Sequence, residues 1–405
     1  MLPAKTDYPV IRSQLQAIGS RIKAQSNFQQ TDNVQGIDRR RLPYGGRVCL
    51  RMPCILLAVN ILRLPSTLSA KRYNACFRPC GSRNRNSAKG PFSMKPITPE
   101  KSKLGFVGIG YMGRPIARRL LESGFKLYAY DRNQGKAGEL VRYGGSVAQS
   151  VSELSSSCDV ILSCLPSDEA VLDLYRGPDS AFANASRGSL VIDMSTVYPE
   201  TSQEISRLGS ERGVEVLDVT ISGSTPAAEK GSLTLFGGGD KECFDAAESI
   251  FRVLARKYFY LGPSGSGAIM KLVVNTLLGI GMQAIAEAIA LGEKAGLDRS
   301  RLLKVLSETA VVAPAHVGKL ERAIKSDYSP QFPIRLMNKD FALILNLAAA
   351  VGARMPATGA AFEVNARQSE QGQEQDFSAV ILQMEKQAHL GSAGNGQSRS
   401  MEEAT

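Results

Sequence analysis

The chain has 405 residues, of which 43% are hydrophobic, so it can bury a sizeable core and is long enough for two domains. Its formal net charge of +11 is unevenly spread: residues 1–93 carry 16 lysines and arginines against 3 acids, whereas residues 94–405 carry 33 against 35. The basic character therefore belongs to the N-terminal segment, and we do not expect the rest of the chain to bind nucleic acid.

Residues 1–93 are rich in arginine, contain four of the seven cysteines and show no sustained periodicity. Together with the residues up to 102 they predict a disordered extension. Three explanations stay open: a start codon assigned too early, with Met94 as the first residue; an organelle-targeting presequence; or a basic arm for nucleic acid or a membrane. The first predicts a cytoplasmic protein, and the second predicts the mitochondrial matrix or a plastid.

Two apolar stretches are candidates for a membrane span. The run from Cys54 to Leu62 is too short, and the run from Leu272 to Leu291 is interrupted by Asn275, Gln283 and Glu287. Both favour a protein without a membrane partner.

Metal ligands are scarce after residue 93. Cys158, Cys164 and Cys243 form no CxxC pair, and only His316 and His389 are available to join them. We therefore expect no metal site and a reduced compartment.

From Lys103 onward, apolar runs of strand length alternate with helix-length segments. This alternation predicts a mostly parallel sheet covered on both faces, a Rossmann-type doubly wound domain over residues 103–264. The predicted strands are Leu104–Gly108, Lys126–Tyr130, Val160–Ser163, Leu190–Asp193, Val214–Asp218 and Leu233–Phe236, and the first predicted helix is Arg114–Ser123.

A Gly- and Ser-rich stretch at residues 261–267 ends this alternation, and only helical patterns follow. We predict an all-helical substrate and oligomerisation domain over residues 265–390 and a disordered tail over 391–405. Its first helix, Ala268–Ala295, is apolar on most faces and ends before Gly296, which predicts a helix between domains or subunits and a homodimer or homotetramer. Further predicted helices are Arg299–Glu308, His316–Ser326, Leu336–Val351 and Thr358–Gln371.

A glycine motif of the form GxGxxG follows the first strand and opens the first helix. Such glycines allow a tight turn, close approach of the backbone to a pyrophosphate and close packing of helix on strand. The free N–H groups at the start of the helix then bind phosphate. The predicted cofactor-binding residues of this turn are Gly108, Ile109, Gly110, Tyr111, Met112 and Gly113.

Asp131 ends the second strand, 18 residues after Gly113. An acid at this point accepts hydrogen bonds from the adenosine ribose and repels a 2′-phosphate, which favours NAD. Arg132 follows directly and can turn toward a 2′-phosphate, so NADP stays an alternative. A solvated turn at Asp131–Asn133 is the third interpretation.

Lys271 and Asn275 are four residues apart on the predicted long helix, so both lie on one face. A lysine on an apolar helix can exchange a proton with an oxygen as hydride reaches or leaves the neighbouring carbon, and desolvation lowers its pKa toward working pH. The amide of Asn275 can hold the same oxygen. In the competing interpretation, Lys271 extends to solvent.

Ser222, Gly223 and Ser224 lie just past a strand end, where open parallel sheets place ligands. Hydroxyl and backbone N–H groups there can hold a substrate carboxylate, although the segment also fits a plain turn.

Residues Lys103 to about His389 resemble the β-hydroxyacid dehydrogenases, which include 3-hydroxyisobutyrate dehydrogenase, tartronate semialdehyde reductase and the glyoxylate/succinic semialdehyde reductases. Five motifs in chain order carry the resemblance: 106–113, 193–196, 222–224 with 231–234, 265–267 through Lys271 and Asn275, and Lys339-Asp340.

The resemblance implies that Lys271 is the catalytic acid/base and that Asn275 positions the substrate. It also implies that Ser222 and Gly223 hold the substrate carboxylate, with no metal involved. The further implied cofactor contacts are Leu165, Pro166, Thr196 and Lys339, the last near the nicotinamide ribose.

Departures from the family pattern bear on the substrate and the cofactor. Ser-Gly-Ser at 222–224, like the segments 259–262 and 377–381, is similar to the glyoxylate/succinic semialdehyde reductases. Those enzymes usually carry Asn at the position of Asp131 and prefer NADP. The substrate-binding segment and the cofactor-binding acid therefore point to different relatives. Ala170 stands where 3-hydroxyisobutyrate dehydrogenase has an asparagine.

The sequence thus predicts reversible hydride transfer between NAD(P) and a short hydroxy acid or its semialdehyde, at a site in the cleft between the two domains. Two alternatives stay open: an imine or sugar-acid reductase on the same fold, and an inactive dehydrogenase-like platform whose basic N-terminal segment binds nucleic acid.

Overall fold

The computed structural model describes residues 94–368 and 370–390. The predictions for residues 1–93 and for the tail lie outside this range, so the cellular location stays a prediction. Residues 94–102, assigned above to the extension, lie against the first domain. Ile97 is 5% exposed, and its N–H donates to the Ala246 carbonyl over 3.0 Å.

An eight-stranded sheet of order β3-β2-β1-β4-β5-β6-β7-β8 forms the first domain. All neighbouring strands are parallel except β6 and β7. This confirms the predicted doubly wound sheet. The strands are β1 Lys103–Val107, β2 Lys126–Tyr130, β3 Ser146–Val147, β4 Val160–Ser163, β5 Leu190–Asp193, β6 Glu215–Ser222, β7 Leu233–Gly238 and β8 Ala255–Tyr260.

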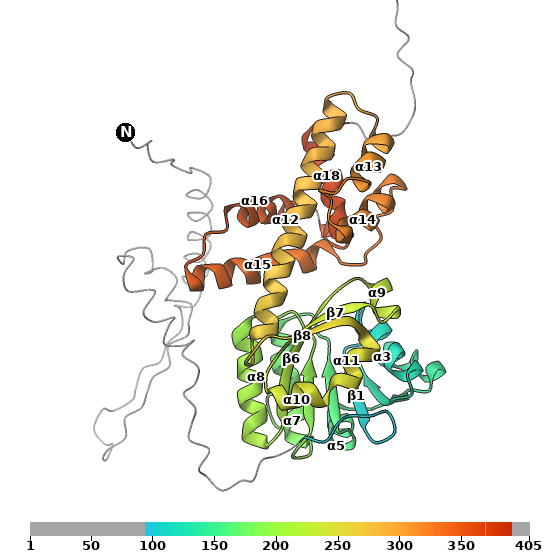
Figure 1. Ribbon diagram of the computed structural model, residues 1–405, viewed down its shortest axis with the longest axis vertical. Coiled ribbons are helices and arrows are strands. Elements are labelled where there is room, and N and C mark those ends of the chain that lie inside the picture. The colour runs from blue at the N-terminus through green and yellow to red at the C-terminus, as the bar shows by residue number, and fades with distance from the viewer. Residues whose placement is uncertain (1–93, 369, 391–405) are drawn as a thin grey trace, which may run out of the picture. The chain divides into compact units, whose positions relative to one another are not determined.

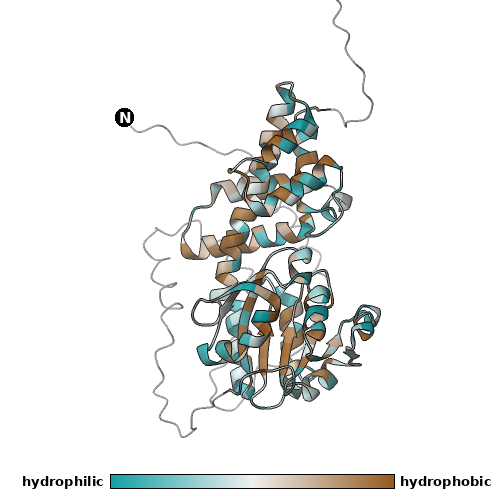
Figure 2. Cartoon of the chain, turned by 45° about the vertical axis from the view of Figure 1, so that its right-hand side comes forward, coloured by the Kyte–Doolittle hydropathy of each residue, from teal (hydrophilic) through white to brown (hydrophobic). Residues whose placement is uncertain are grey.

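The sheet carries a hydrophobic core on each face, because successive strand residues point to opposite sides. Leu104 and Phe106 belong to one core, and Val107 belongs to the other. Figure 2 shows these apolar strands enclosed by helices whose outer surfaces are more polar. The helices and the one 3₁₀ turn of this domain are α3 Gly113–Glu122, α4 Gln134–Gly138, η3 Val141–Tyr143, α5 Val151–Ser157, α6 Asp168–Tyr175, α7 Ala181–Asn184, α8 Pro199–Arg212, α9 Thr225–Glu229, α10 Lys241–Ala246 and α11 Glu248–Leu254.

The sheet differs from the sequence prediction in two strands that the apolar pattern missed. β3 has only two residues, and β8 lies at the sheet edge with exposed Arg256 and Lys257, so neither forms a buried apolar run. β6 and β7 also extend further than predicted, to Ser222 and Gly238.

The second domain is all-helical, as predicted. Its helices surround a separate hydrophobic core that includes Leu272, Met337 and Phe341. The segment after residue 366 differs from the prediction: a separate short helix follows α16, and the last helix was missed. The elements are α12 Ser266–Lys294, α13 Arg299–Ser307, α14 Pro314–Ile324, α15 Ile334–Val351, α16 Pro356–Ala366, α17 Glu370–Gln373, η4 Phe377–Ala379 and α18 Val380–Gln387.

The long helix α12 belongs to both domains. Because β7 and β8 run opposite to β6, the chain returns to the starting end of β6 before α12 begins. The helix contacts β6 and β7 at its beginning and α15, α16 and α18 further along, and Figure 1 shows it rising from the sheet into the helical domain. By length and composition α12 could also cross a membrane, so the absence of a membrane partner stays a prediction.

Candidate active site

The three motif glycines each meet a different steric requirement. Gly108 has a φ of +94°, and a methyl group there would lie 2.4 Å from the Cys164 carbonyl oxygen. A methyl group on Gly113 would lie 1.9 Å from the Gly108 carbonyl oxygen, whereas one on Gly110 would meet nothing within 4 Å. Gly108 therefore forms the turn, Gly113 brings α3 against it, and Gly110 leaves open space for a bound group.

The other residues of the turn complete a site suited to an anion. Ile109 is fully buried, Tyr111 is 51% exposed, and the Met112 sulfur lies 4.0 Å from the Thr225 hydroxyl of α9. No side chain caps the start of α3, and its first turn contains no acid. The N–H groups at the start of this helix therefore face the turn without a carboxylate from the helix itself, which fits the pyrophosphate of a dinucleotide.

Asp131 ties the end of β2 to the glycine turn. Its Oδ2 accepts the Ile109 N–H over 2.8 Å, and its Oδ1 accepts the Asn133 N–H over 2.9 Å. Each carboxylate oxygen keeps a further lone pair for a ribose hydroxyl. The neighbouring Arg132 is exposed and makes no hydrogen bond or ion pair with any part of the chain that the structure describes. The geometry is therefore compatible with both NAD and NADP.

Leu165 borders the same turn. A methyl group on Gly108 would lie 3.0 Å from Leu165 Cδ2, and the Leu165 N–H donates to Ser195 Oγ over 2.9 Å. Pro166 follows at the surface, and Thr196 is partly buried after β5. The predicted cofactor contacts from β4 and β5 therefore lie at the carboxyl edge of the sheet, on the side of Gly108.

A buried hydrogen-bond network supports this edge. The Asp193 carboxylate is 1% exposed and accepts from the hydroxyl of Ser195 over 2.7 Å and from that of Ser163 over 2.6 Å. The Tyr175 hydroxyl in turn donates to Ser163 Oγ over 2.8 Å. Burial raises the pKa of Asp193, while the two serine hydrogen bonds oppose that rise. The network fixes Ser195, and through it the backbone of Leu165.

Lys271 lies in the second turn of α12, partly accessible to solvent but closely surrounded by protein. Burial lowers its pKa to about 8, Asp340 opposes this, and the Lys339 ammonium lowers it further. The side chain also lies near Cys164, whose carbonyl oxygen borders Gly108 of the glycine turn. This environment does not fit the interpretation in which Lys271 simply extends to solvent.

Asn275 is 1% exposed, and its Nδ2 donates to Asp340 Oδ2 over 2.5 Å. A carboxylate only accepts hydrogen bonds, so Asp340 fixes the amide with its nitrogen inward. Asn275 Oδ1 is buried and has no hydrogen-bond partner within residues 94–368 and 370–390. Asn275 therefore presents an acceptor, which suits a hydroxyl or an ammonium. The second hydrogen of Nδ2 can still donate to a carbonyl oxygen, so the predicted role of Asn275 in holding the substrate oxygen stays a prediction.

Lys339 connects the two domains. Its ammonium donates to the Thr196 carbonyl and lies 3.0 Å from Asp340 Oδ1, an ion pair without hydrogen-bond alignment. The side chain is 24% exposed. Lys339 thus lies beside Thr196, next to the predicted cofactor contacts, and holds α15 against the loop after β5.

The predicted substrate-binding segment begins with Ser222, the last residue of β6, and continues into the following loop. Gly223 has a φ of +138°, and a methyl group there would lie 2.8 Å from Leu233 Cδ2, so only glycine fits this bend without strain. Ser224 is exposed and precedes α9 without capping it through its side chain. Because α9 contacts α3, Ser222, Gly223 and Ser224 lie near the glycine turn.

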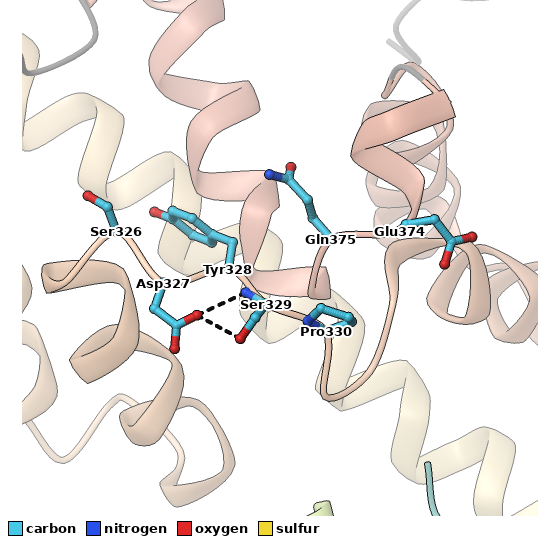
Figure 3. A pocket seen from close by; sticks show the side chains of 7 residues that line it. All are labelled: Ser326, Asp327, Tyr328, Ser329, Pro330, Glu374 and Gln375. Atoms are coloured by element: carbon cyan, nitrogen blue, oxygen red, sulfur yellow. Dashed lines mark hydrogen bonds between the residues drawn. The ribbon is translucent and has the colours of Figure 1, made fainter. Parts of the chain in front are cut away.

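The structure therefore brings the predicted residues of the glycine turn, the β4, β5 and β6 ends, α12 and α15 into one region. A separate cavity of about 400 Å³ lies elsewhere and is lined by none of them. Figure 3 shows its Asp327 turned toward Ser329 of the same loop, a local contact of 2.7 Å between Asp327 Oδ1 and Ser329 Oγ. No group of three or more potential metal ligands occurs in the described parts of the chain.

The sequence analysis assigned no role to three acids that have clear structural roles: Asp193, Asp218 and Asp340. Asp193 and Asp218 interrupt apolar strand runs and are 1% and 2% exposed, while Asp340 lies on the buried side of α15 at 1%. A carboxylate within an apolar run is costly to bury without partners. That signal was present in the sequence, but it did not reveal the partners.

Comparisons with known proteins agree with this arrangement. Residues 103–262 match the model of the NAD binding domain of 6-phosphogluconate dehydrogenase. Residues 265–384 match a model described as NAD-binding of NADP-dependent 3-hydroxyisobutyrate dehydrogenase. The two matches cover both domains of the described structure.

Among curated proteins, the chain is 36% identical over 279 residues to the chloroplastic glyoxylate/succinic semialdehyde reductase 2 of Arabidopsis thaliana, covering 69% of this chain and 78% of that protein. It is 35% identical over 286 residues to an NAD-dependent L-serine dehydrogenase of Pseudomonas aeruginosa, covering 69% and 96%. A solved structure of Mycobacterium tuberculosis 3-hydroxyisobutyrate dehydrogenase with L-serine superposes with a TM-score of 0.62 at 29% identity, covering 69% and 98%.

Proposed function

Because this chain belongs to the β-hydroxyacid dehydrogenase family and is an NAD(P)-dependent hydroxyacid dehydrogenase, we propose that its substrate is a short acid that carries an aldehyde group. We propose that the chain reduces this aldehyde reversibly to the hydroxy acid, with Lys271 as the general acid/base. The observation that carries the proposal is the position of Lys271. Its ammonium lies near the Asp340 carboxylate and near Cys164, whose carbonyl oxygen borders Gly108 of the glycine turn.

A bound nicotinamide supplies the hydride in reduction and accepts it in oxidation. The Lys271 ammonium donates a proton to the carbonyl oxygen during reduction, and the neutral amine takes the hydroxyl proton during oxidation. A pKa of about 8 keeps both forms accessible near neutral pH. Asn275 Oδ1 accepts from the alcohol hydroxyl or from the Lys271 ammonium, and so orients the proton that moves.

A carboxylate on the substrate is supported by the segment after β6. The hydroxyl of Ser222 and the backbone N–H groups of Gly223 and Ser224 are donors suited to carboxylate oxygens. The names of the relatives also point to short acids, namely glyoxylate, succinic semialdehyde and L-serine. A panel of such acids, assayed with both cofactors, identifies the best substrate.

For the cofactor we propose NAD. Asp131 lies at the end of β2 with lone pairs available for the ribose, and a 2′-phosphate would meet its negative charge. The kcat/KM values for NADH and NADPH with one substrate decide this point. A strong preference for NADPH would assign the neighbouring Arg132 to the 2′-phosphate.

The role of Lys271 is tested by Lys271→Ala with the best substrate of the panel. Loss of a general acid/base lowers kcat by about 10²- to 10⁴-fold, whereas NADH binding, measured by fluorescence, stays unchanged. Lys294→Ala is the matched control, because Lys294 is an exposed lysine at the far end of the same helix. Nearly full turnover by Lys271→Ala would show that another group transfers the proton.

We also propose that the protein forms a homodimer or homotetramer. On α12, Val273, Leu277 and Leu291 are 50%, 72% and 72% exposed. Large apolar side chains concentrated on one exposed helix are typical of a surface that another subunit covers.

A further inference from the structure

Asp218 lies in the interior of β6, and its carboxylate is directed at the beginning of α12. Asp218 Oδ1 accepts the Gly265 N–H over 2.9 Å, and Oδ2 accepts the Ala268 N–H over 3.0 Å. The residue is 2% exposed. Its two oxygens thus bind two amides at the start of the helix that carries Lys271, where the helix dipole favours a negative charge.

The surrounding backbone leaves no free space for this helix start to move. A methyl group on Gly267 would lie 2.4 Å from the carbonyl oxygens of both Asp218 and Phe236. The Thr220 hydroxyl donates to the Gly267 carbonyl over 2.8 Å. The first turn of α12 is therefore held against β6 and β7 by direct backbone contact and by three hydrogen bonds from β6 side chains.

Two functional segments start from this one anchor. Along β6, Ser222 lies four residues after Asp218, roughly 13 Å at strand rise. Along α12, Lys271 lies four residues after Gly267, roughly 6 Å at helix rise. Both segments lead away from Asp218 toward the glycine turn, so the position of α12 on β6 determines where Lys271 stands relative to the substrate segment.

We propose that Asp218 is a positioning residue, which fixes α12 on β6 and thereby holds Lys271 in place against the substrate segment that ends this strand. The inference rests on the proposed role of Lys271, and Asp218 itself touches neither substrate nor cofactor. Only an ionised carboxylate offers acceptors to both amides at once. An asparagine at this position presents one acceptor and one donor, so it loses one of the two hydrogen bonds and directs an N–H toward another N–H.

The test is Asp218→Asn, compared with Asp240→Asn as a matched control. Asp240 also accepts two backbone N–H groups at a helix start, those of Glu242 over 2.9 Å and Cys243 over 3.3 Å, but it begins α10. Three quantities are measured: kcat with the best substrate, the Kd for NADH, and the ionisation of Lys271 itself. The last is followed by trace acetylation across a pH series with mass-spectrometric detection of the Lys271 peptide.

We expect Asp218→Asn to lower kcat about tenfold or more, with the Kd for NADH within about twofold of the parent protein. The pKa of Lys271 should rise from about 8 toward its ordinary 10.5, because a loosened helix start admits water to the amine. Asp240→Asn should change none of these quantities. A purely structural role for Asp218 would reduce stability without moving the pKa of Lys271.

The inference is wrong if Asp218→Asn keeps a kcat within about twofold of that of the parent protein and a Lys271 pKa within about 0.3 of the parent value. Should this variant not fold, the same quantities are measured on Thr220→Val, which removes the hydroxyl that donates to the Gly267 carbonyl over 2.8 Å and to the Phe236 carbonyl over 3.5 Å. An unchanged Lys271 pKa and kcat in this folded variant would overturn the inference that the attachment of the helix start to β6 holds Lys271 in place. Failure of the proposed function gives a different result. In that case Lys271→Ala keeps its turnover, while the acetylation measurement on Asp218→Asn still reports the position of the lysine.

Discussion

Two substitutions in the glycine turn should separate stability from cofactor binding. A methyl group on Gly113 would lie 1.9 Å from a backbone oxygen that cannot move aside easily. Such overpacking costs about 1–3 kcal/mol. For a domain of this size, Gly113→Ala should therefore lower the Tm by roughly 2–12 °C.

Gly110→Ala should behave in the opposite way. Its methyl group would meet nothing within 4 Å, and the φ of Gly110 does not require glycine. Restricting the unfolded chain then adds about 0.4–1 kcal/mol of stability. The same methyl group would occupy the space that we assign to the pyrophosphate. Losing one hydrogen bond to a charged group costs about 1.5–3 kcal/mol, so the Kd for NADH should rise roughly 10- to 100-fold.

Both effects are measured on the same preparations, by thermal unfolding and by NADH fluorescence titration. Gly359→Ala is the control, because Gly359 also has open space around it but lies on α16, away from the turn. It should leave the Kd unchanged. A Gly110→Ala variant that binds NADH as tightly as the parent would show that the open side of Gly110 does not face the phosphates. A fully stable Gly113→Ala variant would refute the close packing of α3.

Three further outcomes are expected. With Lys271 as the acid, kcat/KM for reduction should fall as pH rises through about 8, and that for oxidation should rise through the same value; initial rates in both directions check the signs. The Lys319 ammonium lies 2.8 Å from the buried Asp376 carboxylate, and Lys319→Met removes this cation. The free energy of unfolding, measured in urea, should fall by about 3–5 kcal/mol, while the activity per folded molecule is retained. Sedimentation at micromolar concentration should show a dimer or tetramer that Leu277→Glu weakens; a parent protein that is monomeric there would contradict the proposed interface.

Much of the fold follows from local patterns. The strands β2, β4 and β5 are short, mostly apolar runs, and the sequence predicts their bounds as the structure has them. The glycine motif and the spacing of Lys271 and Asn275 are likewise local, and a four-residue spacing places both side chains on one face of any helix. β8 was missed because its two exposed cations break the apolar pattern at a sheet edge.

The rest of the site depends on contacts between residues far apart in the chain. Asp218 meets Gly265 and Ala268 after 47 and 50 residues, and Asn275 meets Asp340 after 65. No periodicity encodes such pairs. The orientation of the Asn275 amide is determined by Asp340, so the sequence left open whether Asn275 presents its donor or its acceptor. The direction of β7, which lets α12 run along β6, is also a property of the assembled sheet.

The length of α12 has a mechanical consequence. Its 29 residues extend over about 44 Å, from the sheet to the contacts with α13 and α18. Because one uninterrupted helix contributes to both hydrophobic cores, we expect it to restrict movement of the two domains relative to each other. We therefore expect substrate entry and product release to depend on movements of short surface loops, such as the one at residues 222–224.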